Sequence, residues 1–155
     1  MTLTHVKADL FTAPPPRSIL VHACNTVGKW GSGIAVPFRE RFPEAFDAYK
    51  THCDEHTREE LIGTCLIIPG KKYDIACLFT SKLYSRKKDG PEDILRATRS
   101  AVEDLMRQNT GGQELHACRF NSGKFAVPWE QTEAVLKELG VDMTVYQPLN
   151  LPPGS

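Results

Sequence analysis

The chain has 155 residues, of which 41% are hydrophobic and 25% charged, and its 19 basic residues balance 19 acidic ones. This length suits one domain with one hydrophobic core. A formal net charge of zero argues against a protein that coats nucleic acid, because that affinity needs many Lys and Arg contacts to phosphates; it still allows a local basic pocket for one anionic ligand.

The first half of the chain alternates short apolar runs with helical patterns. Residues 4–8 are predicted to form an edge or neighbouring strand, and residues 18–23 a buried strand. Apolar side chains then recur every three or four residues from 34 to 49, which predicts a helical stripe. Pro43 is expected to start a second helix within this stripe, and Pro37 either begins or bends the first.

The second half continues the alternation. Further strands are expected at 64–68, 75–80, 115–120 and 143–146, and helices from Pro91 to the Gly111–Gly112 pair and from Trp129 to Leu139. This order predicts a three-layer α/β/α sandwich with a mixed, mainly parallel central sheet. We expect one domain over residues 1–150 and a loose tail over 151–155.

The cysteines and the apolar runs indicate the compartment. There are five cysteines, an odd count without a CxxC pair, so free buried thiols are favoured over a disulfide framework or a zinc site. We therefore expect neither a metal ion nor a cofactor. The sequence has no signal peptide pattern and no apolar run near the roughly 18 residues of a membrane helix. We expect a cytoplasmic or nuclear protein that does not contact membranes.

Two glycine-containing loops each follow a predicted strand and precede a helix. They span Asn25 to Gly33 and Asn121 to Phe125. In open α/β sheets ligands bind beyond the carboxyl ends of the strands, and glycines let backbone N–H groups approach an anion. Either loop alone could be only a tight turn. Together they favour a site that grips a pyrophosphate, with Phe125 lying beneath a sugar or simply in the core.

Several segments of the chain, taken together and in order, resemble macrodomains of the fungal ADP-ribose 1''-phosphate phosphatase type. They are Val6 to Phe11, Val21 to Asn25 with Trp30 to Ala35, Arg41 to Ala45, Cys77 to Ser81, and Asn121 to Glu130. The resemblance implies the macrodomain fold and a site for ADP-ribose. Ala8 departs from the pattern, because a glycine is common at this position.

The resemblance also implies a role for each matching position. Asp9 would accept a hydrogen bond from the adenine amino group, with the Leu10 backbone beside it, and Asn25 would contact the distal ribose. Asn121 and Ser122 could hold the distal phosphate. The backbone amides expected to enclose the diphosphate belong to Gly31, Ser32, Gly33, Ile34, Ser122, Gly123, Lys124 and Phe125.

Two residues are candidates for catalysis. The resembled phosphatases carry a histidine at the position of His22, which could pass a proton near neutral pH; the alternative is a buried histidine satisfied by the backbone. Asp89 could orient a water molecule, or belong only to a solvated charged loop. His52 and His56 flank Cys53 at helical spacing, but a polar helix end is a better interpretation than a metal site.

The resemblance implies hydrolysis of ADP-ribose 1''-phosphate, a by-product of tRNA splicing in that family, to ADP-ribose and phosphate without a metal. Its partner would be this small molecule, and the protein is expected to be a monomer. One alternative is an ADP-ribose reader without turnover. Another is a hydrolase that removes ADP-ribose from modified proteins or nucleic acid. One known form of this last hydrolysis uses a Lys and an Asp, and it is disfavoured here. At the place of that aspartate, after Gly123, the chain has Phe125 and no carboxylate.

Overall fold

The computed structural model describes residues 2–14 and 18–148. The tail predicted at 151–155, and the last two residues of the predicted domain, lie outside these ranges. No helix in the described ranges is both long enough and apolar enough to cross a membrane.

Within the described residues, six strands form one sheet in the order β1-β6-β5-β2-β4-β3. The strands are β1 (Leu3–Lys7), β2 (Ser18–Asn25), β3 (Cys65–Ile68), β4 (Tyr73–Ser81), β5 (Leu115–Cys118) and β6 (Met143–Gln147). All neighbouring pairs are parallel except β3 with β4, which is antiparallel. This confirms the predicted mixed, mainly parallel sheet.

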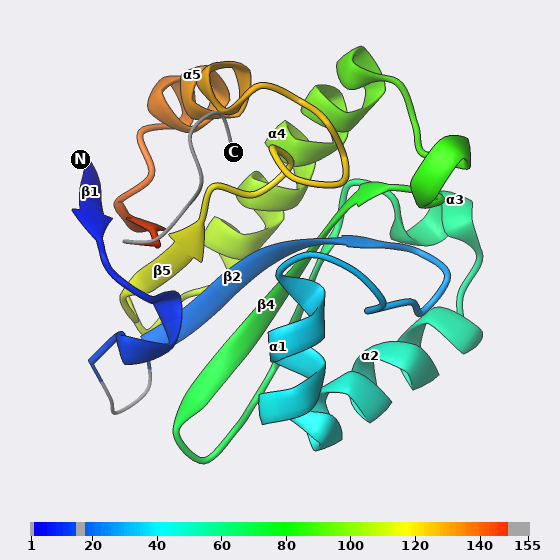
Figure 1. Ribbon diagram of the computed structural model, residues 1–155, viewed down its shortest axis with the longest axis horizontal. Helices are drawn as coiled ribbons and strands as arrows, with labels where there is room; N and C mark the ends of the chain where they lie inside the picture. The colour runs from blue at the N-terminus through cyan, green and yellow to red at the C-terminus, as the bar shows by residue number, and fades with distance from the viewer. Residues whose placement is uncertain (1, 15–17, 149–155) are drawn as a thin grey trace.

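The helices cover both faces of this sheet (Figure 1). They are α1 (Ala35–Arg41), α2 (Pro43–Asp54), α3 (Arg58–Leu61), α4 (Pro91–Gln108) and α5 (Trp129–Leu139), with short 3-10 helices η1 (Leu10–Thr12) and η2 (Ser85–Lys87). Buried side chains of α1 and α2 pack in one cluster on one face, and those of α4 and α5 pack in a second cluster on the other. The predicted three-layer sandwich is confirmed.

The alternation of side chains along β2 divides it between the two layers. Leu20 and Cys24 belong to the cluster with α1 and α2, whereas Ile19 and Val21 belong to the cluster with α4 and α5. Because successive strand residues point to opposite faces, His22 lies on the α1 side with Leu20 and Cys24. This placement decides what His22 contacts.

The prolines mark helix starts, as the sequence predicts. Pro43 is the first residue of α2, and Pro37 lies in the first turn of α1, where no intrahelical N–H bond is lost. Helix α3 was not predicted. It begins with a capping box in which Thr57 and Glu60 bond to each other's backbone N–H, a motif visible in the sequence.

Candidate functional site

The loops that leave β2, β4 and β5 lie next to one another at the carboxyl edge of the sheet. The carbonyl oxygen of Lys82, after β4, accepts hydrogen bonds from the Thr26 N–H at 3.2 Å and the Thr26 hydroxyl at 2.7 Å. A Cβ atom placed on Gly33 would lie 3.7 Å from Cγ of Lys124, which follows β5. We call residues 26–34 together with 121–125 the loop site.

Backbone N–H groups are available on both loops of this site. Within the described chain, the N–H groups of Gly31, Ser32, Gly33 and Ile34 donate to no protein acceptor, and neither do those of Gly123, Lys124 and Phe125. The segments 31–33 and 122–124 are also exposed, while Ile34 and Phe125 are partly buried. Unpaired, exposed amides on two adjoining loops form a setting that suits an anion such as a diphosphate.

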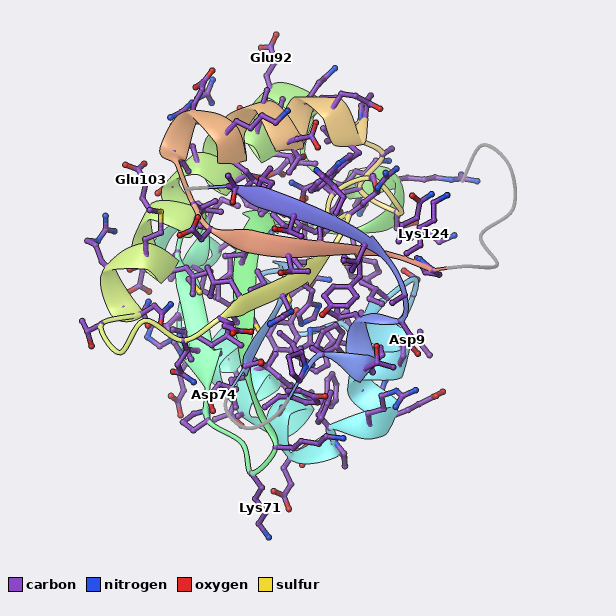
Figure 2. All side chains as sticks on the ribbon, turned by 90° about the vertical axis from the view of Figure 1, so that its left-hand side faces the viewer. Asp9, Lys71, Asp74, Glu92, Glu103 and Lys124 are labelled. Carbon is purple, nitrogen blue, oxygen red and sulfur yellow. The ribbon has the colours of Figure 1, made fainter. Side chains whose placement is uncertain are left out.

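Asp9 and Leu10 follow β1, at the same edge of the parallel strands. Figure 2 shows Asp9 and Lys124 at the same end of the molecule. One carboxylate oxygen of Asp9 accepts a hydrogen bond from the Phe11 N–H at 3.0 Å and so caps η1. Its other oxygen has no partner among the described residues, which leaves an acceptor for an exocyclic amine. The Leu10 side chain is buried in the core.

The Asn25 side chain makes most of its hydrogen bonds within its own loop. Its Oδ1 accepts hydrogen bonds from the Val27 and Lys29 N–H groups and from the Tyr49 hydroxyl, at 3.1, 3.2 and 2.9 Å. Its Nδ2 donates to the Lys29 carbonyl at 2.8 Å. The residue is only 5% exposed. In this structure Asn25 shapes the first loop, and the predicted ribose contact stays a prediction.

Asn121 is buried between the sheet and two helices, and it does not present its side chain to the loop surface. Its Oδ1 accepts from Thr80 of β4, and its Nδ2 donates to Thr98 of α4 and Thr132 of α5, at 2.9, 2.9 and 3.3 Å. With these bonds made, the amide holds the second loop in place. Ser122 is exposed, and its hydroxyl donates to the Arg119 carbonyl, so it is the better placed of the two for a phosphate.

His22 lies in the core, away from the loop surface. The residue has no exposed area, and its ring stacks on Phe38 of α1 with centroids 4.0 Å apart and planes 7° apart. Its Nε2 lies 3.5 Å from the Cys24 sulfur and 4.0 Å from the Cys77 sulfur. The ring is enclosed by aromatic and thiol side chains and has no backbone hydrogen bond among the described residues, so His22 is buried but is not satisfied by the backbone. Its catalytic role stays a prediction.

Asp89 organises the loop after β4. Its carboxylate accepts from the Lys82 N–H at 3.0 Å, and its own N–H donates to the Ser81 hydroxyl at 2.9 Å. The residue is partly buried and its second carboxylate oxygen has no partner in the described chain. Asp89 is therefore tied, through Lys82, to the loop that contains Thr26. The water-orienting role stays a prediction.

The environment changes the pKa of several cysteine thiols. Burial raises the pKa of Cys53 and of Cys118 to about 12 and that of Cys77 well above its usual value. Burial also acts to raise the pKa of Cys24, but hydrogen bonding with Cys77 and the charge of His22 outweigh it and bring the value to about 5. The cysteines are free thiols, as the sequence predicts, and all but the partly buried Cys118 are buried; strand pairing brings Cys24 and Cys77 together with His22.

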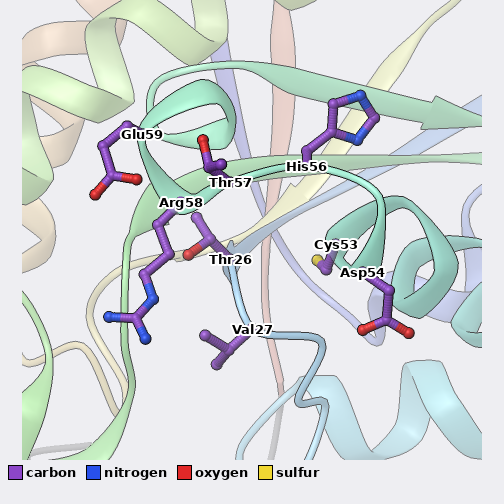
Figure 3. Close-up of a pocket in the computed structure, with 8 residues that line it drawn as sticks. All are labelled: Thr26, Val27, Cys53, Asp54, His56, Thr57, Arg58 and Glu59. Atoms are coloured by element: carbon purple, nitrogen blue, oxygen red, sulfur yellow. The ribbon is translucent and has the colours of Figure 1, made fainter.

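An open pocket of about 520 Å³ adjoins the first loop on the side of α2 and α3 (Figure 3). It is lined by Thr26, Val27, Cys53, Asp54, His56, Thr57, Arg58 and Glu59. No residue proposed from the sequence as a binding or catalytic group is among them. Arg58 makes no ion pair within the described residues, and Figure 3 shows its side chain extending past Thr26.

Several residues that shape the site were not predicted. Tyr49 and the threonines that bond to Asn121 act from helices and strands distant in sequence, so only strand order and register bring them together. Thr26 is different, because it lies inside the predicted first loop between Asn25 and the glycines. A hydroxyl at that place was a visible signal for a loop-to-loop bond.

A family model described as Macro domain matches residues 21–136. ADP-ribose 1''-phosphate phosphatase of Chaetomium globosum is 42% identical over 90% of this chain and 86% of that protein. The protein of the same name from Lodderomyces elongisporus is 40% identical over 94% of this chain and 98% of its own length.

A solved structure agrees with these relatives. The macrodomain of Mycobacterium tuberculosis DarG superposes with a TM-score of 0.74 and 26% identity, over 95% of this chain and 98% of that one. The sheet order, the two covering layers and the matched segment all describe one class of α/β domain. The chain belongs to the macro domain family, and the predicted resemblance is confirmed.

Proposed function

We propose that this protein hydrolyses ADP-ribose 1''-phosphate to ADP-ribose and phosphate, and that ADP-ribose binds in the loop site. The observation that carries this proposal is the likeness to curated relatives of that name, at 36–42% identity over nearly the whole chain. The alignments cover 90–94% of this chain and 86–98% of these relatives.

The free amides of the loop site support the binding half of the proposal. A diphosphate between residues 31–34 and 123–125 would accept hydrogen bonds from N–H groups that have no other partner in the described chain. Asp9 would bind the adenine amino group with its unpaired oxygen. The same carboxylate already caps η1, which holds it in position without using both oxygens.

The chemistry required is hydrolysis of a phosphate monoester. Either water attacks phosphorus and the P–O bond breaks, or water attacks the anomeric carbon and the C–O bond breaks; both routes give ADP-ribose and inorganic phosphate. A carboxylate can orient the attacking water, and amide N–H groups can stabilise charge on the phosphoryl oxygens. Asp89 is the candidate for the first task because one of its oxygens is unpaired beside the loop that carries Thr26.

The direct test is phosphate release from ADP-ribose 1''-phosphate by purified protein in EDTA, with ADP-ribose affinity measured by calorimetry on the same sample. We expect multiple-turnover phosphate release and saturable ADP-ribose binding. Binding without release would contradict the enzymatic half of the proposal and leave the reader function. Absence of both would contradict the whole proposal.

Asp9→Asn isolates the adenine contact. The amide oxygen can still cap η1, but an N–H₂ group replaces the free carboxylate oxygen and would face the adenine amine. We expect ADP-ribose affinity to fall roughly tenfold, the equivalent of one charge-assisted hydrogen bond, with the melting temperature unchanged. Glu92→Gln is the matched control, because Glu92 is an exposed carboxylate on α4, away from Asp9 in Figure 2. Equal ADP-ribose affinity in the two variants would contradict the assignment of Asp9 to the adenine amino group.

A reader function is the second candidate, and the burial of His22 favours it. With its ring enclosed by Phe38, Cys24 and Cys77, His22 offers no proton to a ligand on the loops. If the protein is an enzyme, Asp89 is then the one of the two candidate catalytic residues that remains. Asp89→Asn distinguishes the two functions: it should abolish phosphate release and leave ADP-ribose affinity within about twofold if the protein is the enzyme.

A further inference from the structure

The face of the sheet beneath the first loop carries a cluster of three metal-ligating side chains. They are His22 and Cys24 of β2 and Cys77 of β4, and their ligand atoms all lie within 4.8 Å of one another. All three residues are buried, with exposed fractions of 0, 3 and 0%. The cluster plays no part in the proposed binding of ADP-ribose.

Strand pairing produces this cluster. His22 lies opposite Cys77 in the parallel pair of β2 and β4, and Cys24 is two residues further along β2, so all three point to the α1 side. The two cysteines are offset by two positions, because Cys24 lies opposite Phe79. Strand spacing then puts their Cα atoms roughly 8 Å apart, beyond the reach of a disulfide. Cys24 and Cys77 are therefore not placed to form a disulfide.

The distances fit one metal ion. With bonds of about 2.3 Å to sulfur and about 2.0 Å to nitrogen, three ligands in a plane would place sulfur and nitrogen roughly 3.7 Å apart and the two sulfurs roughly 4.0 Å apart. His22 Nε2 is 3.5 Å from one sulfur and 4.0 Å from the other. His22 Nδ1 is also 3.7 Å from the Cys24 sulfur, so the imidazole ring would have to turn to aim Nε2 at an ion held between the two sulfurs.

The surroundings also suit an occupied site. The indole N–H of Trp30 is buried without a hydrogen-bond partner in the described chain, and its ring packs edge-on against His22 with centroids 4.9 Å apart. This buried indole N–H could donate to a metal-bound sulfur and so stabilise the negative charge of the thiolate. Thiolate sulfur with imidazole nitrogen selects thiophilic ions, Zn²⁺ and Cu⁺ among those available to cells.

We propose that His22, Cys24 and Cys77 bind one thiophilic metal ion, Zn²⁺ or Cu⁺, as a structural site beneath the first loop. Binding needs both cysteines as thiolates and His22 as a neutral imidazole, so the protons that these groups hold would be released to solvent, and Zn²⁺ would leave the site electrically neutral. An ion there would join β2 to β4 directly below Asn25 and Trp30. Its role is structural, and phosphate release in EDTA remains the expectation for the reaction.

The test measures metal bound to the full chain. Reduced protein is incubated with one equivalent of Zn²⁺, or anaerobically with Cu⁺, passed through a desalting column and assayed by mass spectrometry of the metal. We expect close to one ion per chain from at least one of the two metals, and the metal retained identifies the ion. At a hundredfold excess over Kd, the melting temperature should rise by roughly 5 °C or more. Retention of neither metal would overturn the proposal.

Variants locate the ion. Cys77→Ser should lose the bound metal and the thermal shift, whereas Cys118→Ser, which changes a cysteine of β5 outside the cluster, should keep both. Circular dichroism shows whether Cys77→Ser folds, and Cys77→Ala is the substitute if the buried hydroxyl prevents folding. The wild-type protein loaded with Co²⁺ should also show a sulfur-to-cobalt absorption band. Equal metal loss in the Cys77 and Cys118 variants would place the ion elsewhere.

Discussion

The loops that follow β2 and β5 are each held by one buried asparagine, but the two asparagines bond to different parts of the molecule. Asn25 bonds mainly within its own loop, to Val27 and Lys29. Asn121 bonds to hydroxyls on β4, α4 and α5, and so connects one loop to the sheet and to one helical layer. One loop is organised locally and the other by tertiary structure, which means that equivalent substitutions should have unequal effects.

Asn121→Ala should have the largest effect. It removes the amide from three buried threonine hydroxyls, of which Thr98 keeps its bond to the Ile94 carbonyl, and puts alanine at a φ of +68°, so we expect the free energy of unfolding to fall by about 3 kcal/mol. Urea denaturation measures the loss. Ser122→Ala, one residue further and exposed, should change stability by less than about 0.5 kcal/mol. A similar loss in both variants would contradict the anchoring role of Asn121.

Asn25→Ala should cost less, about 1.5 kcal/mol, because the amide groups it frees lie next to exposed Lys29 and can reach water. The Tyr49 hydroxyl keeps a second acceptor, the Asn25 carbonyl at 2.7 Å. The larger consequence should be a fall in ADP-ribose affinity, since the first loop loses its internal bonds. Calorimetry and urea denaturation on one sample separate the two quantities. Loss of stability with unchanged affinity would show that this loop does not bind the ligand.

The smallest expected effect comes from a pair of glycine substitutions. Gly33 has a φ of +60°, and a new Cβ would contact Lys124, so Gly33→Ala should destabilise by about 1 kcal/mol. Gly123 has no positive φ and open space around its Cα, so Gly123→Ala should be neutral within about 0.3 kcal/mol. Thermal denaturation of both variants decides the matter. Destabilisation by Gly123→Ala instead would reverse the comparison of the two loops.

Apolar periodicity and strand order were enough to predict the layers, and position at strand ends was enough to predict which loops lie together. Side-chain use was harder to predict. Whether Asn121 points to solvent or to Thr98 depends on where α4 crosses the sheet, which local sequence does not encode. His22 illustrates the same limit, because strand alternation puts it on one face with Leu20 and Cys24, but only the tertiary structure shows that α1 covers that face.

Helix α3 shows the opposite kind of omission. Its capping box, Thr57 to Glu60, was present in the sequence, but the four-residue helix that follows is too short to show a period. A local hydrogen-bond motif would have predicted it where periodicity could not. Its position matters, because Arg58 and Glu59 line the open pocket beside the first loop.

The edge strand β1 has β6 as its one neighbour in the described sheet. During synthesis on a ribosome, therefore, β1 has no pairing partner until residues 143–147 have been made. The layers around β2, β4 and β5 can form earlier, while Asp9 takes its place only after β1 pairs. The end of the site expected to hold adenine is thus completed last, and a nascent chain stalled before β6 would carry the diphosphate loops without it.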